Sequence, residues 1–112
     1  MTQTTKRNTE QDKEIANTIN QQIGQKAFYM LGAKNKAYGV DKNGMVYLGF
    51  RIRGSKKANY IKVIYDEGMD LYHMEFGKIR KYEYKVVHVE TGLYFDMLHK
   101  TIEENTGLYT SL

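Results

Sequence analysis

Residues 45–63 read MVYLGFRIRGSKKANYIKV, and their alternation predicts the architecture of the chain. The apolar side chains of the first half fall on one face of a strand: Val46, Leu48, Phe50 and Ile52. The other face alternates with them: Tyr47, Gly49, Arg51 and Arg53. Because successive side chains of a strand point to opposite sides, we expect a half-buried strand whose solvent face is cationic and aromatic. Residues 60–66 repeat the alternation, with Lys62 on the solvent face.

Further strands are predicted on both sides of this stretch. The turn at 41–44, Asp-Lys-Asn-Gly, favours a hairpin that joins a short strand at 38–40 to the strand at 45–53, because Asn-Gly accepts positive φ. Alternation also predicts strands at 69–76 and 81–89, separated by a break at 77–80. The apolar run at 27–31 indicates a strand covered on both faces, followed by a loop at 32–36.

Two helices are expected to flank these strands. The first begins near Asn8 or Thr9, carries an apolar stripe of isoleucines at every fourth residue, and ends at Gly24. The second spans about 93–104, with Tyr94 opening its stripe. The predicted fold class is therefore α+β: an antiparallel four- to five-stranded meander sheet with an N-terminal and a C-terminal helix on one face. Residues 1–8 are expected to be a disordered polar tail and 9–112 a single domain. Four tyrosines at stripe positions are expected in the core: Tyr65, Tyr72, Tyr84 and Tyr94.

Charge is distributed unevenly along the 112 residues, whose net charge is +4. Residues 26–89 carry 13 cations against 6 anions, whereas 90–112 carry one cation against 4 anions. Such a field favours polyanionic partners. The absence of cysteine excludes disulfides and thiolate metal sites. No apolar run approaches the roughly 18 residues of a membrane span, so we expect a cytoplasmic protein with no membrane contact.

The residues with catalytic potential favour a non-enzymatic protein. There is no glycine-rich phosphate loop, and the three histidines lack metal-ligand spacing and are interpreted as surface residues: His73, His88 and His99. Acids cluster at Asp66, Glu67 and Asp70, where a tight turn around Gly68 accounts for them. We therefore expect no cofactor and no metal.

The solvent face of the sheet is the main candidate site. Rings on that face can stack with bases while cations neutralise phosphates, which is the pattern of single-strand binding. The candidate nucleic-acid-binding residues are Tyr47, Arg51, Arg53, Lys56, Lys57, Tyr60 and Lys62. Lys78, Arg80 and Lys81 could extend this patch. The alternative is that these side chains only keep an outer sheet face solvated.

A second hypothesis is a protein-interaction module that inhibits or modulates a host or defence protein. The apolar C-terminus supplies its candidate partner-binding residues, Leu108, Tyr109 and Leu112, which otherwise fold back on the helix. Pairing of exposed sheet edges into a homodimer is a further alternative.

Several stretches resemble a set of short proteins carried by bacteriophages, prophages and related mobile elements. The similar pieces are residues 32–35, KKANYIKV at 56–63, DLYHMEFGKIR at 70–80 and TGLYTSL at 106–112, within a resemblance that spans about 15–112. No activity is attached to that set. The resemblance implies a bacterial host cytosol and a mobile genetic element as the setting.

Overall fold

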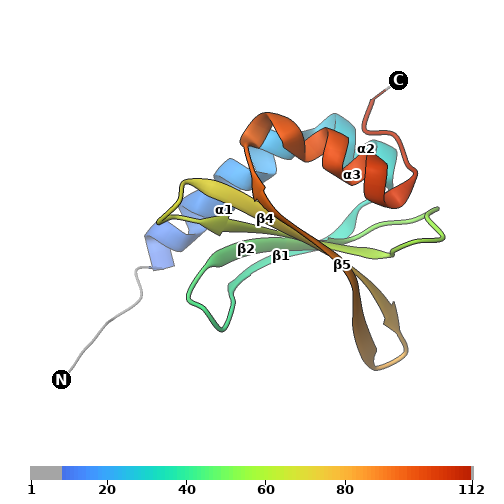
Figure 1. Ribbon diagram of the computed structural model, residues 1–112, viewed down its shortest axis with the longest axis horizontal. Coiled ribbons are helices and arrows are strands. Elements are labelled where there is room, and N and C mark those ends of the chain that lie inside the picture. Colours follow the sequence, from blue (N-terminus) through green and yellow to red (C-terminus); the bar gives the residue numbers. More distant parts are fainter. Residues whose placement is uncertain (1–8, 112) are drawn as a thin grey trace.

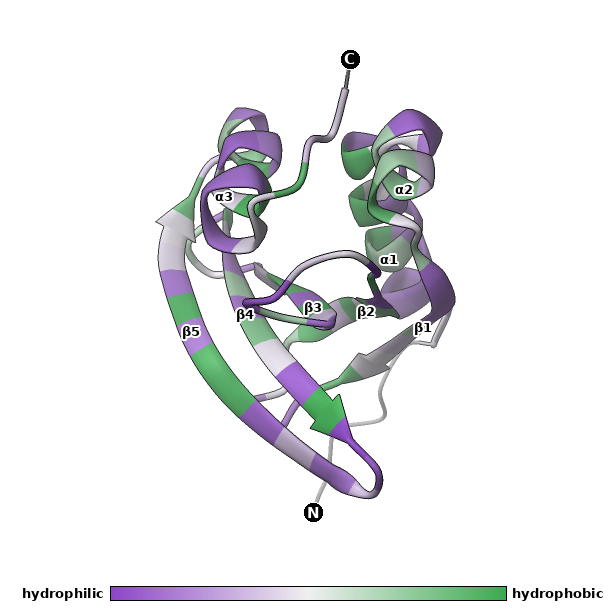
Figure 2. Ribbon diagram, turned by 90° about the vertical axis from the view of Figure 1, so that its right-hand side faces the viewer, coloured by the Kyte–Doolittle hydropathy of each residue, from purple (hydrophilic) through white to green (hydrophobic). Residues whose placement is uncertain are grey.

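The protein is a five-stranded antiparallel sheet with its helices on one face, as predicted (Figure 1). The computed structural model describes residues 9–111, so the predicted polar tail at 1–8 and Leu112 lie outside the described residues. Consecutive strands are neighbours throughout, in the order β1-β2-β3-β4-β5. Figure 2 shows the helices together on one side of the curved sheet, which leaves the other side uncovered.

Two helices precede the five strands, and one follows them. The elements are α1 (Thr9–Ile23), α2 (Gln25–Leu31), β1 (Lys34–Val40), β2 (Val46–Arg51), β3 (Tyr60–Asp66), β4 (Leu71–Arg80), β5 (Glu83–Leu93), the 3-10 turn η1 (Phe95–Met97) and α3 (Leu98–Thr106). None of the helices within residues 9–111 is both long and apolar enough to cross a bilayer.

The core lies between the helices and the inner face of the sheet. Phe50 and Phe76, on β2 and β4, are fully buried, and Phe50 meets the ring of Phe28 from α2 edge to face with centroids 5.1 Å apart. The isoleucine stripe of α1 and the Leu98 and Ile102 side chains of α3 close the core from above. The predicted alternation of β2 and β3 is therefore confirmed.

The run at 27–31, predicted as a strand, is part of helix α2, so that prediction is wrong. The first helix does end before Gly24, as predicted, since Gly24 has φ 85° and lies outside both helices. A second helix begins directly after it, and the Gly24 carbonyl accepts the Phe28 N–H of α2. The spacing of four that runs through Ile19 and Ile23 continues to Ala27 and Leu31, and all four are buried. Gly32, at φ 63°, supplies the left-handed C-cap.

The strands are longer than predicted. β4 continues through Gly77 to Arg80, where a break was expected, because a tyrosine ring from β5 occupies the space that Gly77 leaves open. β1 begins at Lys34, inside the predicted loop. β5 runs to Leu93 through the left-handed Gly92, at φ 68°. Because the chain at 93–94 is extended, α3 begins only at Leu98.

Two of the four tyrosines predicted in the core are exposed. Tyr72 is buried and Tyr65 is half-buried against it, with ring centroids 5.3 Å apart. Tyr84 lies on the outer face and Tyr94 is 62% exposed, so those two predictions are wrong. The predicted core positions assumed a regular strand at 81–89 and a helix from residue 93. β5 has a bulge and α3 begins only at Leu98, so neither assumption holds for Tyr84 and Tyr94.

Asn59 extends the β3–β4 ladder beyond the end of β3. Its amide group donates to the Ile79 carbonyl at 3.0 Å, and its carbonyl oxygen accepts the Ile79 N–H at 2.7 Å. The side chain thus occupies the place of one further residue of backbone pairing. These two hydrogen bonds give Asn59 a structural role in the sheet.

Replacing Asn59 with alanine is expected to lower the free energy of unfolding by about 1–3 kcal/mol, because it removes both partners of Ile79 at a partly buried position. Urea unfolding followed by circular dichroism measures the change. The exposed neighbour Lys57 serves as control, and Lys57→Ala should stay within about 0.5 kcal/mol. Equal stability of the two variants would contradict the assignment.

Candidate nucleic-acid interface

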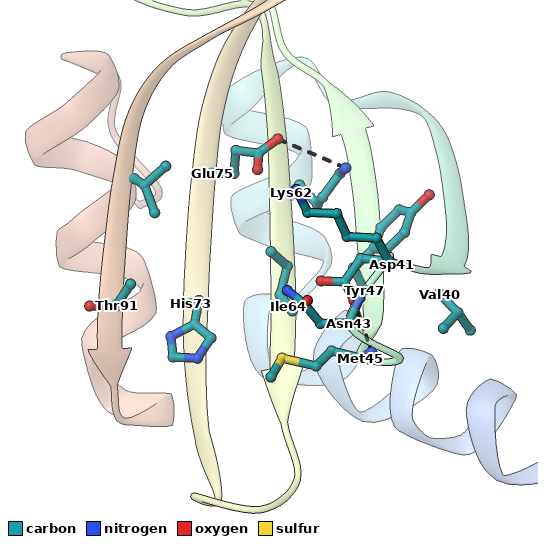
Figure 3. A pocket seen from close by; sticks show the side chains of 12 residues that line it. Val40, Asp41, Asn43, Met45, Tyr47, Lys62, Ile64, His73, Glu75 and Thr91 are labelled. Carbon is teal, nitrogen blue, oxygen red and sulfur yellow. Dashed lines mark hydrogen bonds and ion pairs between the residues drawn. The ribbon is translucent and has the colours of Figure 1, made fainter.

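Four of the predicted site residues share the outer face of the sheet. In the β2–β3 register, Tyr47 lies opposite Ile64 and Arg51 lies opposite Tyr60, while Lys62 lies opposite Gly49. The next strand continues these rows with His73, Glu75 and Gly77. Figure 3 looks onto this face, with the helices behind the sheet. Five residues were predicted to share this face. Tyr47, Arg51, Tyr60 and Lys62 do so, whereas Arg53 lies beyond the end of β2 and is not part of the paired face.

The centre of the outer face is balanced in charge. The Lys62 ammonium lies 3.8 Å from the Glu75 carboxylate and 4.5 Å from the centroid of the Tyr47 ring (Figure 3). The Tyr84 hydroxyl donates to the same carboxylate at 2.7 Å. A basic sheet face was expected here. Because Glu75 neutralises Lys62, the middle of this face presents no net positive charge.

Three tyrosine rings lie along the outer face over glycines of neighbouring strands. Each pair joins adjacent strands: Gly39 with Tyr47, Gly49 with Tyr60, and Gly77 with Tyr84. Tyr60 and Tyr84 also meet edge to face at 5.4 Å. Burial raises the pKa of both phenols above the ordinary value. These rings therefore form the surface of the sheet, in the way that aromatic side chains cover glycines in strands.

Cations that have no ion-pair partner among residues 9–111 are concentrated at one end of the sheet, which we call the basic end. It comprises the strand ends and connections within 34–35, 51–60 and 78–85, on the right of Figure 1. Its nine cations are Lys34, Arg51, Arg53, Lys56, Lys57, Lys78, Arg80, Lys81 and Lys85. Glu83 is the one acid in the same segments. Across residues 9–111, no ion pair joins any of the nine to an acid.

Arg51 and Arg53 line one groove of the basic end, with a volume of about 440 Å³. Lys34 enters it from β1, where it is the register partner of Arg51. The remaining lining residues are Asn35, Ile52 and Asn59. Arg53 lies just beyond β2, where its backbone N–H donates to the Leu31 carbonyl at 3.0 Å. The groove thus holds two guanidinium groups and one ammonium group, which can donate hydrogen bonds to an anion.

A second groove of about 330 Å³ lies on the β4–β5 hairpin. Lys78 and Lys85 face each other across it, and Arg80, Glu83 and Val87 complete its lining. Sequence reasoning had treated Lys78, Arg80 and Lys81 as a possible extension and had missed Lys34 and Lys85. The missing signal is strand pairing, which places residues far apart in the sequence at one end of the sheet.

Lys56 and Lys57 project from the connection between β2 and β3. Ser55 anchors this loop, because its hydroxyl donates to the Thr106 carbonyl at 2.7 Å and accepts the backbone N–H groups of Lys57 and Ala58. Ala58 is buried beneath it, whereas both lysines are exposed. The loop therefore holds its cations outward at the basic end.

The opposite end of the sheet is acidic and its acids serve the turns. Asp66 accepts the Met69 N–H at 3.2 Å, and the Tyr65 hydroxyl donates to Asp70 at 2.6 Å, which raises the pKa of Tyr65 to about 12. The Gly92 N–H donates to His73 Nδ1, so Nε2 carries the ring proton and donates to Asp66 at 3.1 Å. This hydrogen bond lowers the pKa of Asp66. The structural interpretation of this turn is supported.

The other two histidines are hydrogen-bonded within the fold. His99 Nε2 lies 2.7 Å from the Ile23 carbonyl, and His88 is hydrogen-bonded to Glu90 at 2.6 Å. In the described part of the chain, no group of three or more His, Asp or Glu side chains is placed to hold a metal ion.

The C-terminal residues fold back on α3. Leu108 packs against the core, and the backbone and hydroxyl of the buried Thr110 both donate to the Glu103 carboxylate. These hydrogen bonds lower the pKa of Glu103. Tyr109 is 72% exposed, and Leu112, the third predicted partner-binding residue, lies outside the described residues. Docking of Leu108 agrees with the expectation that the tail returns to the helix.

A comparison with models of known protein families found no match, and neither the curated proteins nor the solved structures gave one. The resemblance to phage and prophage proteins therefore stays a prediction. The fold and the surface described above carry the functional argument alone.

Proposed function

We propose that the protein is a non-enzymatic accessory protein of a phage-like element that binds the phosphate backbone of nucleic acid through its basic end. The observation that carries the proposal is a set of nine cations that have no acidic partner within the described range 9–111, against one acid, Glu83, in the same segments. An unneutralised cluster of this size gains free energy from a polyanion because binding releases condensed counterions.

The two grooves supply the contacts. Arg51, Arg53 and Lys34 hold phosphate oxygens in the first groove, and the lysines of the hairpin meet the backbone further along. Tyr60 does not line the first groove, but it is the register partner of Arg51 and directly follows Asn59, which does. A base next to a bound phosphate meets this ring first, so stacking is assigned to Tyr60. Lys62 and Tyr47 contact each other and play a smaller part.

Binding to a labelled single-stranded oligonucleotide should depend steeply on salt. With four to six phosphates contacted, the slope of log K against log salt is expected at roughly −3 to −4, since each contact contributes about −0.7 for single strands. Fluorescence anisotropy at several salt concentrations measures this slope. Single-stranded DNA, single-stranded RNA and a duplex are compared in parallel. Absence of binding to all three at low salt would overturn the proposal.

The alternative function, binding of a host or defence protein, is favoured by exposed aromatic side chains next to α3. Tyr94 and Phe95 are each 62% exposed and Met97 is 40% exposed, and Tyr109 adds a further ring on the C-terminal segment. Such residues are enriched in protein interfaces. A pull-down from nuclease-treated host lysate tests this function. Tyr109→Ala is the suitable variant, because Leu108 supports the core.

A further inference from the structure

We propose that two copies of the chain associate through the free edge of β5, so that their sheets join into one continuous ten-stranded sheet. β5 is hydrogen-bonded only to β4 and lies along one edge of the sheet, where Figure 2 shows apolar stretches on it. At 11 residues it is the longest strand in the fold. A long unpaired strand with apolar side chains is a template for another strand.

The two edges of the sheet differ in how they meet solvent. β1, at the other edge, carries Lys34 and Lys36, and its pairing with β2 is interrupted beside Asn35, which has φ 58°. Lysines and irregular backbone protect an edge from adding strands. β5 instead exposes Val86, Val87 and Val89, each between 42% and 50%. β5 also has Lys85 and two register irregularities, but its greater length and its exposed valines make it the better template of the two edges.

A bulge in β5 fixes which residues share a face. Gly77 pairs with Val86 and Phe76 pairs with His88, so Val87 is an extra residue on β5. Because of this residue, Lys85 and Glu90 lie on the same face although they are five positions apart. Their partners in β4, Lys78 and Met74, confirm this, since both lie on the helix-bearing side of the alternation.

This arrangement makes β5 complementary to itself. When a second β5 runs antiparallel about a two-fold axis at His88, Lys85 of each copy faces Glu90 of the other, and Val86 faces Val89. An isologous interface requires such a pattern, because each contact occurs twice. Two ion pairs and two valine pairs thus form in one register. A foreign strand would match these charges only if its own sequence happened to carry them, so the charge pattern favours a second copy of this chain as the partner.

The same register covers aromatic side chains beyond the ends of the paired segment. Tyr82, at the tip of the hairpin, is fully exposed, and Tyr94 follows β5 directly. β5 has a second extra residue, because Met74 pairs with Glu90 and Tyr72 pairs with Leu93. When this residue is allowed for, the register places Tyr82 of one copy beside Tyr94 of the other. Aromatic pairs at both ends would add contact area to the strand pairing.

A charge exchange tests the register. Sedimentation without nucleic acid should show a dimer, and Lys85→Glu or Glu90→Lys alone should raise its dissociation constant on the order of tenfold, since two attractive pairs become repulsive. The double variant should restore dimerisation. Glu104→Lys on α3 is the matched control, and the thermal unfolding of each variant monitors folding.

Cysteine cross-linking provides a second measurement, because the native chain has no cysteine. Directly opposed residues of antiparallel strands have Cα atoms about 4.5–5.5 Å apart, within disulfide range. A mixture of Val86→Cys and Val89→Cys chains should therefore cross-link on oxidation, whereas each variant alone should not. A monomer at every concentration, a dimer unaffected by Lys85→Glu, or a mixture that fails to cross-link overturns the proposal. These measurements are made without nucleic acid and test association alone. Because Lys85 also lines the second groove, nucleic-acid binding is measured on the native chain and on the Arg51 and Arg53 variants.

Discussion

The double variant Arg51→Glu and Arg53→Glu is expected to bind a single-stranded oligonucleotide about 100-fold more weakly than the native chain at low salt. Both side chains line the groove of about 440 Å³, and neither has an acidic partner among residues 9–111. Reversal removes two phosphate contacts and adds repulsion, so the salt slope should also become shallower by about 1.4. Fluorescence anisotropy measures both quantities.

The matched control carries the same change in net charge elsewhere. Lys42 lies in the turn at the acidic end of the sheet, and Lys100 is exposed on α3. The variant Lys42→Glu with Lys100→Glu should therefore weaken binding only by its effect on net charge, within about threefold at moderate salt, where distant charges are screened. Equal losses in the two double variants would show that binding follows total charge and would remove the basic end as the site.

Replacing Phe50 with alanine is expected to lower the free energy of unfolding by about 3–5 kcal/mol. Phe50 is fully buried and packs against Phe28, so truncation leaves a cavity where the sheet meets α2. A domain of this size has a total stability of about 5–15 kcal/mol, so the variant should unfold at a temperature lower by more than about 10 °C. Differential scanning calorimetry or urea unfolding measures the loss.

Phe95 provides the comparison for Phe50, because it is the same side chain at 62% exposure on η1. Phe95→Ala should change stability by no more than about 0.5 kcal/mol. If Phe50→Ala were tolerated equally well, the packing of β2 against α2 would be wrong. That result would also displace Arg51, whose position depends on the same strand.

The sheet could be predicted from the sequence because its signals are local. The alternation at 46–52 and the Asn-Gly turn at 43–44 fix the hairpin, and the side chains of Arg51 and Lys62 follow from the same alternation. The interpretation of Gly24 as the end of the first helix is correct, but the apolar run at 27–31 was interpreted as a strand. The spacing of four from Ile19 to Leu31 was available in the sequence and favours a second helix there.

The arrangement of charge could be predicted only in part. Alternation identifies the face of β3 on which Lys62 lies. It does not show that the charge of Lys62 is neutralised, because Glu75 lies opposite Lys62 only in the β3–β4 register. The approach of Lys34 to Arg51 likewise depends on pairing between strands separated along the chain. Charges that meet through strand register leave no local pattern in the sequence, so the basic end became visible only with the fold.

The tyrosine–glycine pairs of the outer face have a consequence for how this surface can change over time. A ring and the gap beneath it fill one volume jointly, so a methyl group added at Gly77 would collide with Tyr84. Overpacking of this kind costs about 1–3 kcal/mol. A larger residue at position 77 therefore requires a smaller side chain at position 84, so substitutions at the two positions should occur together. In a comparison of relatives, we therefore expect positions 77 and 84 to covary in those proteins that keep this sheet.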